Sequence, residues 1–325
     1  MERRFPFLTA NARVAVRLTL VLILVAIVLA VARGPVAVGQ TTLNGLVAAG
    51  YFSLGAVGLT LVFGSLRIIN FAHGDLLTLG AYVTLGISAI GLPFWPAAAL
   101  AIAATAGIAL VLDRIVWEPM RRKRASTLQL FLVAIGLAMV IRYTIQFFAG
   151  SQPRSVGQDV LSAIVVGPFH LGALQGLALI VGVAAATLVG LGLAFTPFGK
   201  KIRALADDVA LAEVSGVDTR RMIRLVWLVA GGLAALAGVL YAAAVGSVNP
   251  NFGFLILLSL FTAAVLGGIG NAYGALAGGL IVGLAQEWST LFFNARWKPV
   301  VGFAILIVML LVMPRGIFGS GRARS

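Results

Sequence analysis

The sequence predicts an all-α polytopic membrane protein with about 8–10 transmembrane helices, some of them broken or re-entrant. Of its 325 residues, 61% are hydrophobic and only 10% are charged, and the mean hydropathy is +1.06. Several uncharged runs also reach or exceed the roughly 20 residues that cross a hydrocarbon core of about 30 Å. These runs cover residues 43–66, 76–112, 160–199 and 225–286.

The longer runs must fold back on themselves, and Gly, Pro and Asn clusters at 91–93, 249–251 and 267–274 mark where. We therefore expect spans near residues 18–33, 43–64, 76–90, 97–113, 126–147, 172–195, 224–245, 254–268, 273–292 and 299–313. The expected organisation is a cytoplasmic segment 1–17, one transmembrane domain 18–316 with a cytoplasmic loop at 196–223, and a cytoplasmic tail 317–325. The first run also resembles a signal peptide ending at residues 30–32, but a retained helix is favoured because the rest is polytopic.

The net charge of +14 is distributed by side of the membrane. With a cytoplasmic amino terminus, most basic residues fall on one side: Arg3, Arg4, Arg13, Arg17, Arg67, Arg114, residues 121–124, the six bases of 200–224, Arg315, Arg322 and Arg324. The other side receives Arg33, Arg142, Arg154, Arg296 and Lys298. This asymmetry follows the positive-inside rule with both termini cytoplasmic, and it explains the charge without nucleic acid as a partner.

The sequence lacks the motifs of most enzyme classes. It has no cysteine and two histidines, with no HExxH or GxSxG pattern and no GxxxxGK[ST] phosphate loop. The sequence therefore predicts no catalytic residues, no metal site and no cofactor in this chain, and no ATP hydrolysis by the chain alone.

Two interruptions of the apolar runs carry polar residues. The first, at residues 67–75, contains Asn70, His73 and Asp75, and it fits either a cytoplasmic turn or a discontinuous helix that enters a transport pathway. The second, at residues 267–274, contains Asn271, and its Asn-Ala-Tyr-Gly weakly repeats the Asn70 motif. Broken helices occur at membrane depth only where protein or a watery cavity covers the backbone.

The longest charged segment near the middle of the chain is residues 200–224. We expect a helix from Lys200 to Val214, with Gly216 as its carboxyl-terminal stop. One face of this helix is an apolar stripe, and charged residues border it. That stripe consists of Ile202, Leu205, Val209 and Ala212. Its first-turn lysines and last-turn Glu213 oppose the helix dipole. The positive-inside rule accounts for the lysines alone, whereas a short amphipathic helix between two spans also fits docking into a groove on another protein.

Ordered motifs from about Asn44 onward resemble the permease family of branched-chain amino acid ABC importers, in particular its LivH-type subunit. The motifs are residues 44–64, 69–75, 79–82, 201–217, 261–271 and 314–319. The resemblance implies an importer permease in a prokaryotic inner membrane. It implies four kinds of partner: a LivM-like second permease, two cytosolic ATP-binding subunits that hold ATP and Mg, a periplasmic substrate-binding protein, and membrane lipid.

The resemblance also implies roles for particular residues. The expected translocation-pathway residues are Asn44, Asn70, His73, Asp75, Tyr82 and Asn271. The expected ATPase-coupling residues are Gly199, Lys200, Ile202, Arg203, Ala204, Leu205, Asp207, Asp208, Val209 and Gly216. The implied solutes are leucine, isoleucine and valine. Urea, short amides or other amino acids remain alternatives, because permeases of this kind need only be permissive when a binding protein selects. An ion-coupled secondary transporter would need further intramembrane acids near Asp75 and Glu287, and a passive channel leaves residues 200–224 unexplained.

Overall fold

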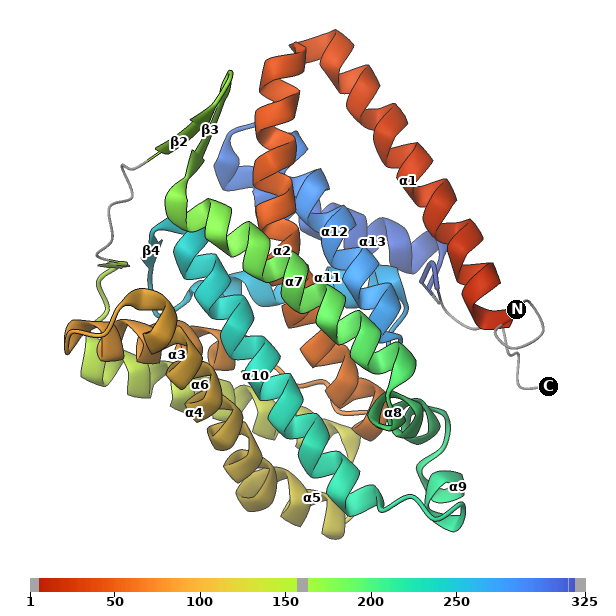
Figure 1. Ribbon diagram of the computed structural model, residues 1–325. Coiled ribbons are helices and arrows are strands. Elements are labelled where there is room, and N and C mark those ends of the chain that lie inside the picture. The colour runs from red at the N-terminus through yellow and green to blue at the C-terminus, as the bar shows by residue number, and fades with distance from the viewer. Residues whose placement is uncertain (1–5, 157–162, 315, 319–325) are drawn as a thin grey trace.

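The computed structural model describes residues 6–156, 163–314 and 316–318 (Figure 1). The start of the expected amino-terminal segment, the last residues of the expected tail, and Arg3, Arg4, Arg315, Arg322 and Arg324 lie outside the described residues. Ten helices coincide with the ten expected spans. They are α1 (Pro6–Arg33), α2 (Pro35–Leu66), α3 (Ala72–Ala89), α4 (Phe94–Leu112), α6 (Thr127–Ala149), α7 (Ala173–Phe195), α10 (Thr219–Val245), α11 (Phe252–Gly267), α12 (Ala272–Ser289) and α13 (Lys298–Val312).

The described residues contain seven helices that are long and apolar enough to cross a membrane. Helix α11, with 16 residues, is about 24 Å long and so is shorter than the roughly 30 Å hydrocarbon core. Helix α2, with 32 residues, is about 48 Å long and extends beyond that core. The chain is thus an all-α polytopic membrane protein whose spans are unequal in length.

Short elements connect the spans. A π-helical turn, η1 (Asp113–Trp117), and α5 (Glu118–Arg122) prolong α4, while α8 (Pro197–Asp207) and α9 (Val209–Val214) join α7 to α10. Strands β2 (Ala163–Val166) and β3 (Phe169–Gly172) form an antiparallel hairpin, and β1 (Arg154–Ser155) pairs antiparallel with β4 (Ser247–Val248). A 3-10 turn, η2 (Ala295–Trp297), precedes α13.

The core lies around α2, which packs against α10, α12, α7 and α11. Small residues bring α2 and α12 together, since a Cβ on Gly283 would lie 2.6 Å from Ala49 N and one on Gly279 would lie 2.4 Å from Ser53 Cα. Lipid provides little hydrophobic drive between helices, so this close backbone approach, with its van der Waals contacts, holds the two spans together.

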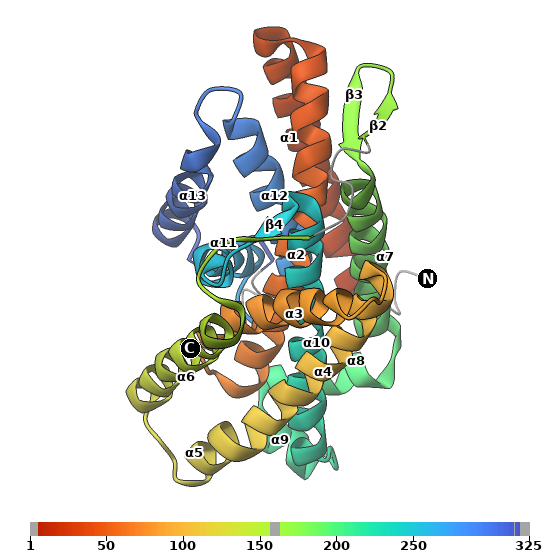
Figure 2. The same cartoon turned by 90° about the vertical axis from the view of Figure 1, so that its left-hand side faces the viewer.

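The two ends of the molecule differ in what they carry. In Figure 1, α5, α8 and α9 lie at one end, which we call the coupling end, and the β2–β3 hairpin and the α1–α2 connection lie at the other. Figure 2 shows the same separation after a turn of 90°. At the second end, Arg33 at the end of α1 lies 4.5 Å from the ring centroid of Phe292, which follows α12.

Candidate translocation pathway and coupling site

The first interruption is a true break between two helices. Helix α2 ends at Leu66, and Arg67 takes a left-handed conformation with φ 55°. Asn70 then starts α3, because its Oδ1 accepts a hydrogen bond from Ala72 N at 3.1 Å. Asn70, His73 and Asp75 are buried, whereas Arg67 and Ile69 of the same segment are exposed. The segment between α2 and α3 therefore encloses three polar side chains within the helix bundle.

His73 joins the first turn of α3 to α2. Its Nε2 lies 2.9 Å from Gly55 O and donates to that carbonyl when Nε2 carries the proton. Gly58 makes room for the ring, since a Cβ there would lie 2.8 Å from the His73 Cε1 atom. The histidine expected in the pathway therefore faces the interior of the helix bundle in this conformation.

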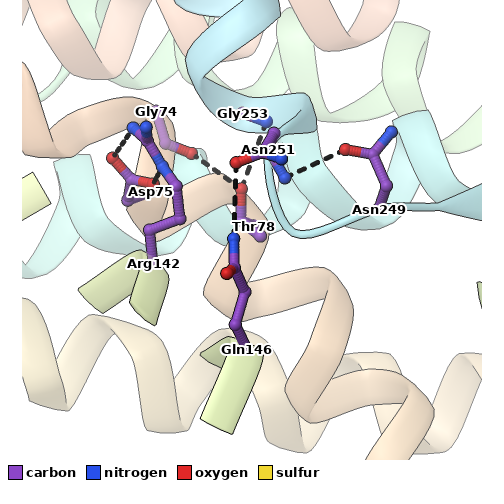
Figure 3. Close-up of polar contacts among 8 residues, drawn as sticks. All are labelled: Gly74, Asp75, Thr78, Arg142, Gln146, Asn249, Asn251 and Gly253. Carbon is purple, nitrogen blue, oxygen red and sulfur yellow. Dashed lines mark hydrogen bonds and ion pairs between the residues drawn. The ribbon is translucent and has the colours of Figure 1, made fainter. Parts of the chain in front are cut away.

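Asp75 forms a two-point ion pair with Arg142 of α6 (Figure 3). Arg142 Nε donates to Asp75 Oδ1 at 2.9 Å and Nη2 donates to Oδ2 at 3.0 Å. The guanidinium also lies 4.5 Å from the ring centroid of Phe254 in α11. Arg142 lies about 22 Å along α6 from Thr127, within the span, where a buried carboxylate neutralises it.

Polar contacts beside this ion pair tie α3 and α6 to the start of α11 (Figure 3). Thr78 Oγ1 accepts from Gly253 N at 3.2 Å, and Gln146 Nε2 lies 3.5 Å from Asn251 Oδ1. Asn249 Oδ1 in turn accepts from Asn251 N at 2.9 Å. Three helices distant in sequence are therefore joined by polar contacts at one place, and sequence reasoning did not single out Arg142, Gln146 or Asn251 as site residues.

The other expected pathway residues are dispersed. Asn44 accepts from Gln40 within α2 at 3.2 Å, and Tyr82 donates to Val248 O at 3.3 Å. Asn271 caps α12, where its Oδ1 accepts from Tyr273 N and Gly274 N, each at 3.1 Å. The structure brings His73 and Asp75 into one turn of α3 but gathers the six residues into no single lining.

A hollow of about 300 Å³ lies where the first break meets the start of α6. The break contributes Arg67, Ile68 and Ile69, and α6 contributes residues including Thr127 and Phe131. The sequence carried no motif for the α6 part of this lining, because contact between segments about 60 residues apart depends on how the helices pack.

The two breaks share one local geometry. Asn70 and Asn271 each accept, through Oδ1, the N–H of the residue two positions later at 3.1 Å, and each begins a helix. A glycine in the first turn of each helix then approaches another backbone: Gly74 meets Gly253, and Gly274 meets Gly267. The weak sequence repeat thus corresponds to similar hydrogen bonds at both positions, although Asn271 directly precedes α12 and Asn70 lies one residue further from α3.

The expected single helix from Lys200 to Val214 is wrong, because α8 and α9 are separated at Asp208. This residue is extended (φ −158°, ψ 117°), and its Oδ1 accepts from Leu211 N at 3.0 Å. Asp favours the position before a helix because its side chain satisfies a free N–H there, so it ends α8 and starts α9. Asp208 therefore lies where the helix dipole favours an acid, whereas Glu213 lies in the last turn of α9 and opposes the dipole, as expected. Gly216 does end the segment, with φ 85° and its N–H donating to Glu213 O.

Three residues of the expected apolar stripe are buried, and the fourth is exposed. Ile202 (6% exposed), Leu205 (1%) and Ala212 (3%) pack inward, whereas Val209 is 37% exposed. The remaining expected coupling residues occupy three settings. Gly199 is buried, Ala204 is half-buried, and Lys200, Arg203, Asp207, Asp208 and Gly216 are exposed.

Outward-facing apolar side chains at this end come from α9. Leu211 is 66% exposed and Val214 is 87% exposed, and neither belonged to the expected stripe. The three-residue spacing between them places both on one side of a helix. Recognising α9 as a helix separate from α8 would have identified these two residues from the sequence.

Three close contacts attach α8 to the spans. A Cβ on Gly199 would lie 2.0 Å from Leu193 O, so only glycine fits the turn from α7 into α8. Arg203 donates through Nη1 to that same carbonyl. Arg67, at the first break, donates through Nη2 to Ala206 O at 3.2 Å. Helix α8 is therefore fastened both to α7 and to the break between α2 and α3.

A family model described as the permease component of the branched-chain amino acid transport system matches residues 41–310. The chain belongs to this permease family. The permease is 33% identical over 294 residues to the high-affinity branched-chain amino acid transport system permease protein LivH of Escherichia coli, covering 86% of this chain and 95% of LivH. It is 30% identical over 301 residues to BraD of Pseudomonas aeruginosa, with the same two coverages. A probable LivH of Methanocaldococcus jannaschii is 27% identical over 276 residues, covering 81% of this permease and 87% of that protein.

Proposed function

We propose that this permease imports leucine, isoleucine and valine across a prokaryotic inner membrane as part of an ATP-driven importer. Its partners are a LivM-like second permease, two cytosolic ATP-binding subunits that hold ATP and Mg, and a periplasmic binding protein that delivers the solute. Family membership and the names of the relatives at 33% and 30% identity support the solute class. In this arrangement both termini and the coupling end face the cytoplasm, as the positive-inside rule requires.

The ATP-binding subunits contact the α8–α9 segment. The observation that carries this assignment is that α8 is fastened to α7 and to the first break, while Leu211 and Val214 of α9 point outward. Exposed apolar side chains on a short helix fit a groove on another protein. ATP shifts the equilibrium between outward-open and inward-open states only if the ATP-bound subunits bind the two states differently, and α8 provides the contact through which they do so.

The translocation pathway runs along the face formed by α6, α11 and α13. Only 17% of the α6 span and 6% of the span that contains α13 are buried within this chain, although α6 packs onto α3 and α13 packs onto α11. Half-buried Arg142 and Gln146 on α6 are unsuited to contact with lipid tails. A second permease chain covering this face would enclose them and leave a polar route between the two subunits.

The test is transport by the complete complex reconstituted in vesicles. We expect ATP-dependent uptake of labelled leucine when the ATP-binding subunits and the binding protein are present. Uptake of urea but not leucine would reassign the solute within the same importer class. Uptake driven by a proton gradient without the ATP-binding subunits would overturn the proposed mechanism.

A further inference from the structure

A cavity of about 410 Å³ at the coupling end lies between the α4–α5 unit and the start of α10. Four arginines line it: Arg121, Arg122, Arg220 and Arg224. The nine lining residues also include three acids, Asp113, Glu118 and Glu213. The outward-facing Leu211 and Val214 of the proposed ATPase contact do not line the cavity, although Glu213 of α9 does.

Two of the acids are already neutralised. Asp113 Oδ1 accepts from Arg121 at 2.7 Å, and Glu118 Oε1 accepts from Arg122 at 2.6 Å. Among the described residues, Arg220 and Arg224 form no ion pair. Four arginines against three acids leave one positive charge, which equals the charge that a single phosphodiester would neutralise.

Hydrogen-bond donors in the cavity are also unsatisfied. Arg121 Nη1 and Arg224 Nε are buried and have no acceptor in the described part of the chain. A buried donor without a partner costs free energy comparable to a lost hydrogen bond. Guanidinium groups suit phosphate oxygens, because their donors are planar and fixed in a fork.

The cavity lies at the depth of lipid headgroups. The helix from Phe94 to Arg122 has 29 residues and is about 43 Å long, so a core of about 30 Å leaves its last turns, with α5, beyond the hydrocarbon. On α10, Leu228 follows Arg224 by one turn and is 38% exposed. Gly232, one turn further, packs against α4, since a Cβ there would lie at ordinary contact distance, 3.7 Å from Ala106 and 3.9 Å from Ile102.

We propose that this cavity binds the phosphodiester of an anionic phospholipid, whose acyl chain lies over the exposed Leu228 of α10. The arginines hold the phosphate, and Leu228 contacts the chain. Basic pockets between transmembrane helices at the cytoplasmic side are suited to such headgroups. A protein carboxylate could meet the same arginines but would not cover the exposed Leu228 one turn further along α10, so the lipid is the favoured occupant.

The test measures lipid binding to the full-length permease in detergent. We expect about tenfold tighter binding of phosphatidylglycerol than of phosphatidylcholine, and about a tenfold loss of that binding in Arg224→Gln and Arg220→Gln. Arg220 is exposed, so its variant tests the site without disturbing the core. The matched control is Arg114→Gln, which removes an exposed arginine at similar depth outside the lining, and we expect less than about a twofold change.

Three results would overturn the proposal. Equal binding of the two lipids would show that charge is not recognised, and an equal loss in Arg114→Gln would show that the effect is general. Displacement of the lipid by millimolar inorganic phosphate would assign the cavity to free phosphate. Unchanged lipid binding in Arg220→Gln and Arg224→Gln, together with lost co-purification of the ATP-binding subunits, would assign the arginines to that protein contact.

Discussion

The two-point ion pair between Asp75 and Arg142 is enclosed by three helices. Its carboxylate has no exposed surface, and its guanidinium is 14% exposed. Removing one partner of a buried pair leaves an uncompensated charge, whereas removing both leaves none. The stability of the permease should therefore depend on the two residues jointly.

We predict that Asp75→Asn or Arg142→Gln alone lowers the free energy of unfolding by about 3–5 kcal/mol. The double variant should recover much of that loss, because neither charge is then left alone. Unfolding of the purified permease in detergent measures each value. Equal losses in the double variant and in the sum of the single variants would show that the pair is not coupled.

A surface ion pair in the same chain serves as the control. Arg122 and Glu118 lie four residues apart on α5, and the Arg122 side chain is 68% exposed. Solvent screens such a pair and keeps each charge hydrated when its partner is removed. Arg122→Gln should therefore leave the unfolding transition unchanged within error.

Sequence reasoning identified single residues better than their partners. Asp75 was recognisable because an acid between two apolar runs needs a partner or water. Arg142 was not recognised as that partner, since nothing in one sequence states which of several arginines meets that acid across 67 positions. His73 was expected to line the pathway, but its hydrogen bond to Gly55 O depends on α2 and α3 packing side by side.

At the scale of whole elements, α2 and α12 make the most extensive contact of any two helices in the described residues. Gly283 lies against Ala49, and Gly45 lies against Leu284. The sequence showed many glycines inside the apolar runs, which indicated close helix packing in general. It could not say which glycines face another backbone and which face open space.

We predict that Gly283→Ala lowers the free energy of unfolding by about 1–3 kcal/mol, because its Cβ would lie 2.6 Å from Ala49 N and force the helices apart. Gly107→Ala in α4 is the control, since nothing lies within 4 Å of its added Cβ. That variant should be neutral or stabilising by up to about 1 kcal/mol, as alanine favours a helix over glycine. Thermal unfolding of the two variants in one detergent compares them, and equal destabilisation would contradict the packing argument.

The separation of α8 from α9 changes which residues are suited to test coupling. Ile202 and Leu205 face inward, so replacing them would disturb the fold as well as any interface. Leu211 and Val214 are exposed and can be changed without removing internal contacts.

We predict that Leu211→Asp with Val214→Asp reduces co-purification of the ATP-binding subunits at least about tenfold, because two charges would enter an apolar contact. Membrane insertion should survive. Val165→Asp in the β2–β3 hairpin is the control, because it places an acid at an exposed apolar position (58% exposed) at the other end. Undiminished co-purification of the double variant would exclude α9 from the interface.

At the scale of the whole molecule, the sequence predicted the architecture closely. All ten expected spans have a helix, and seven helices of the described residues are long and apolar enough to cross a membrane, since continuous apolar runs are a strong signal. The tilt of the spans, the contact of α6 with the first break, and the charged cavity beside α10 were not predictable. They depend on long-range packing, which leaves no periodic trace in one sequence.

The separation of the two ends gives a direct test of orientation. The sequence contains no cysteine, so a single introduced thiol is the only reactive thiol in the chain. We predict that Ser215→Cys, between α9 and α10, reacts with a membrane-impermeant reagent only from the cytoplasmic side, and Val165→Cys only from the opposite side. Labelling of both from one side would contradict the proposed topology.

The hydrogen bond from Arg67 to Ala206 O has a mechanical consequence. It spans 139 positions of sequence but joins α8 directly to the residue at which α2 ends. A displacement of α8 must either carry that residue along or break the bond. Motion of α8 can therefore reach the break between α2 and α3 through a single side chain, while the rest of the helix bundle stays in place.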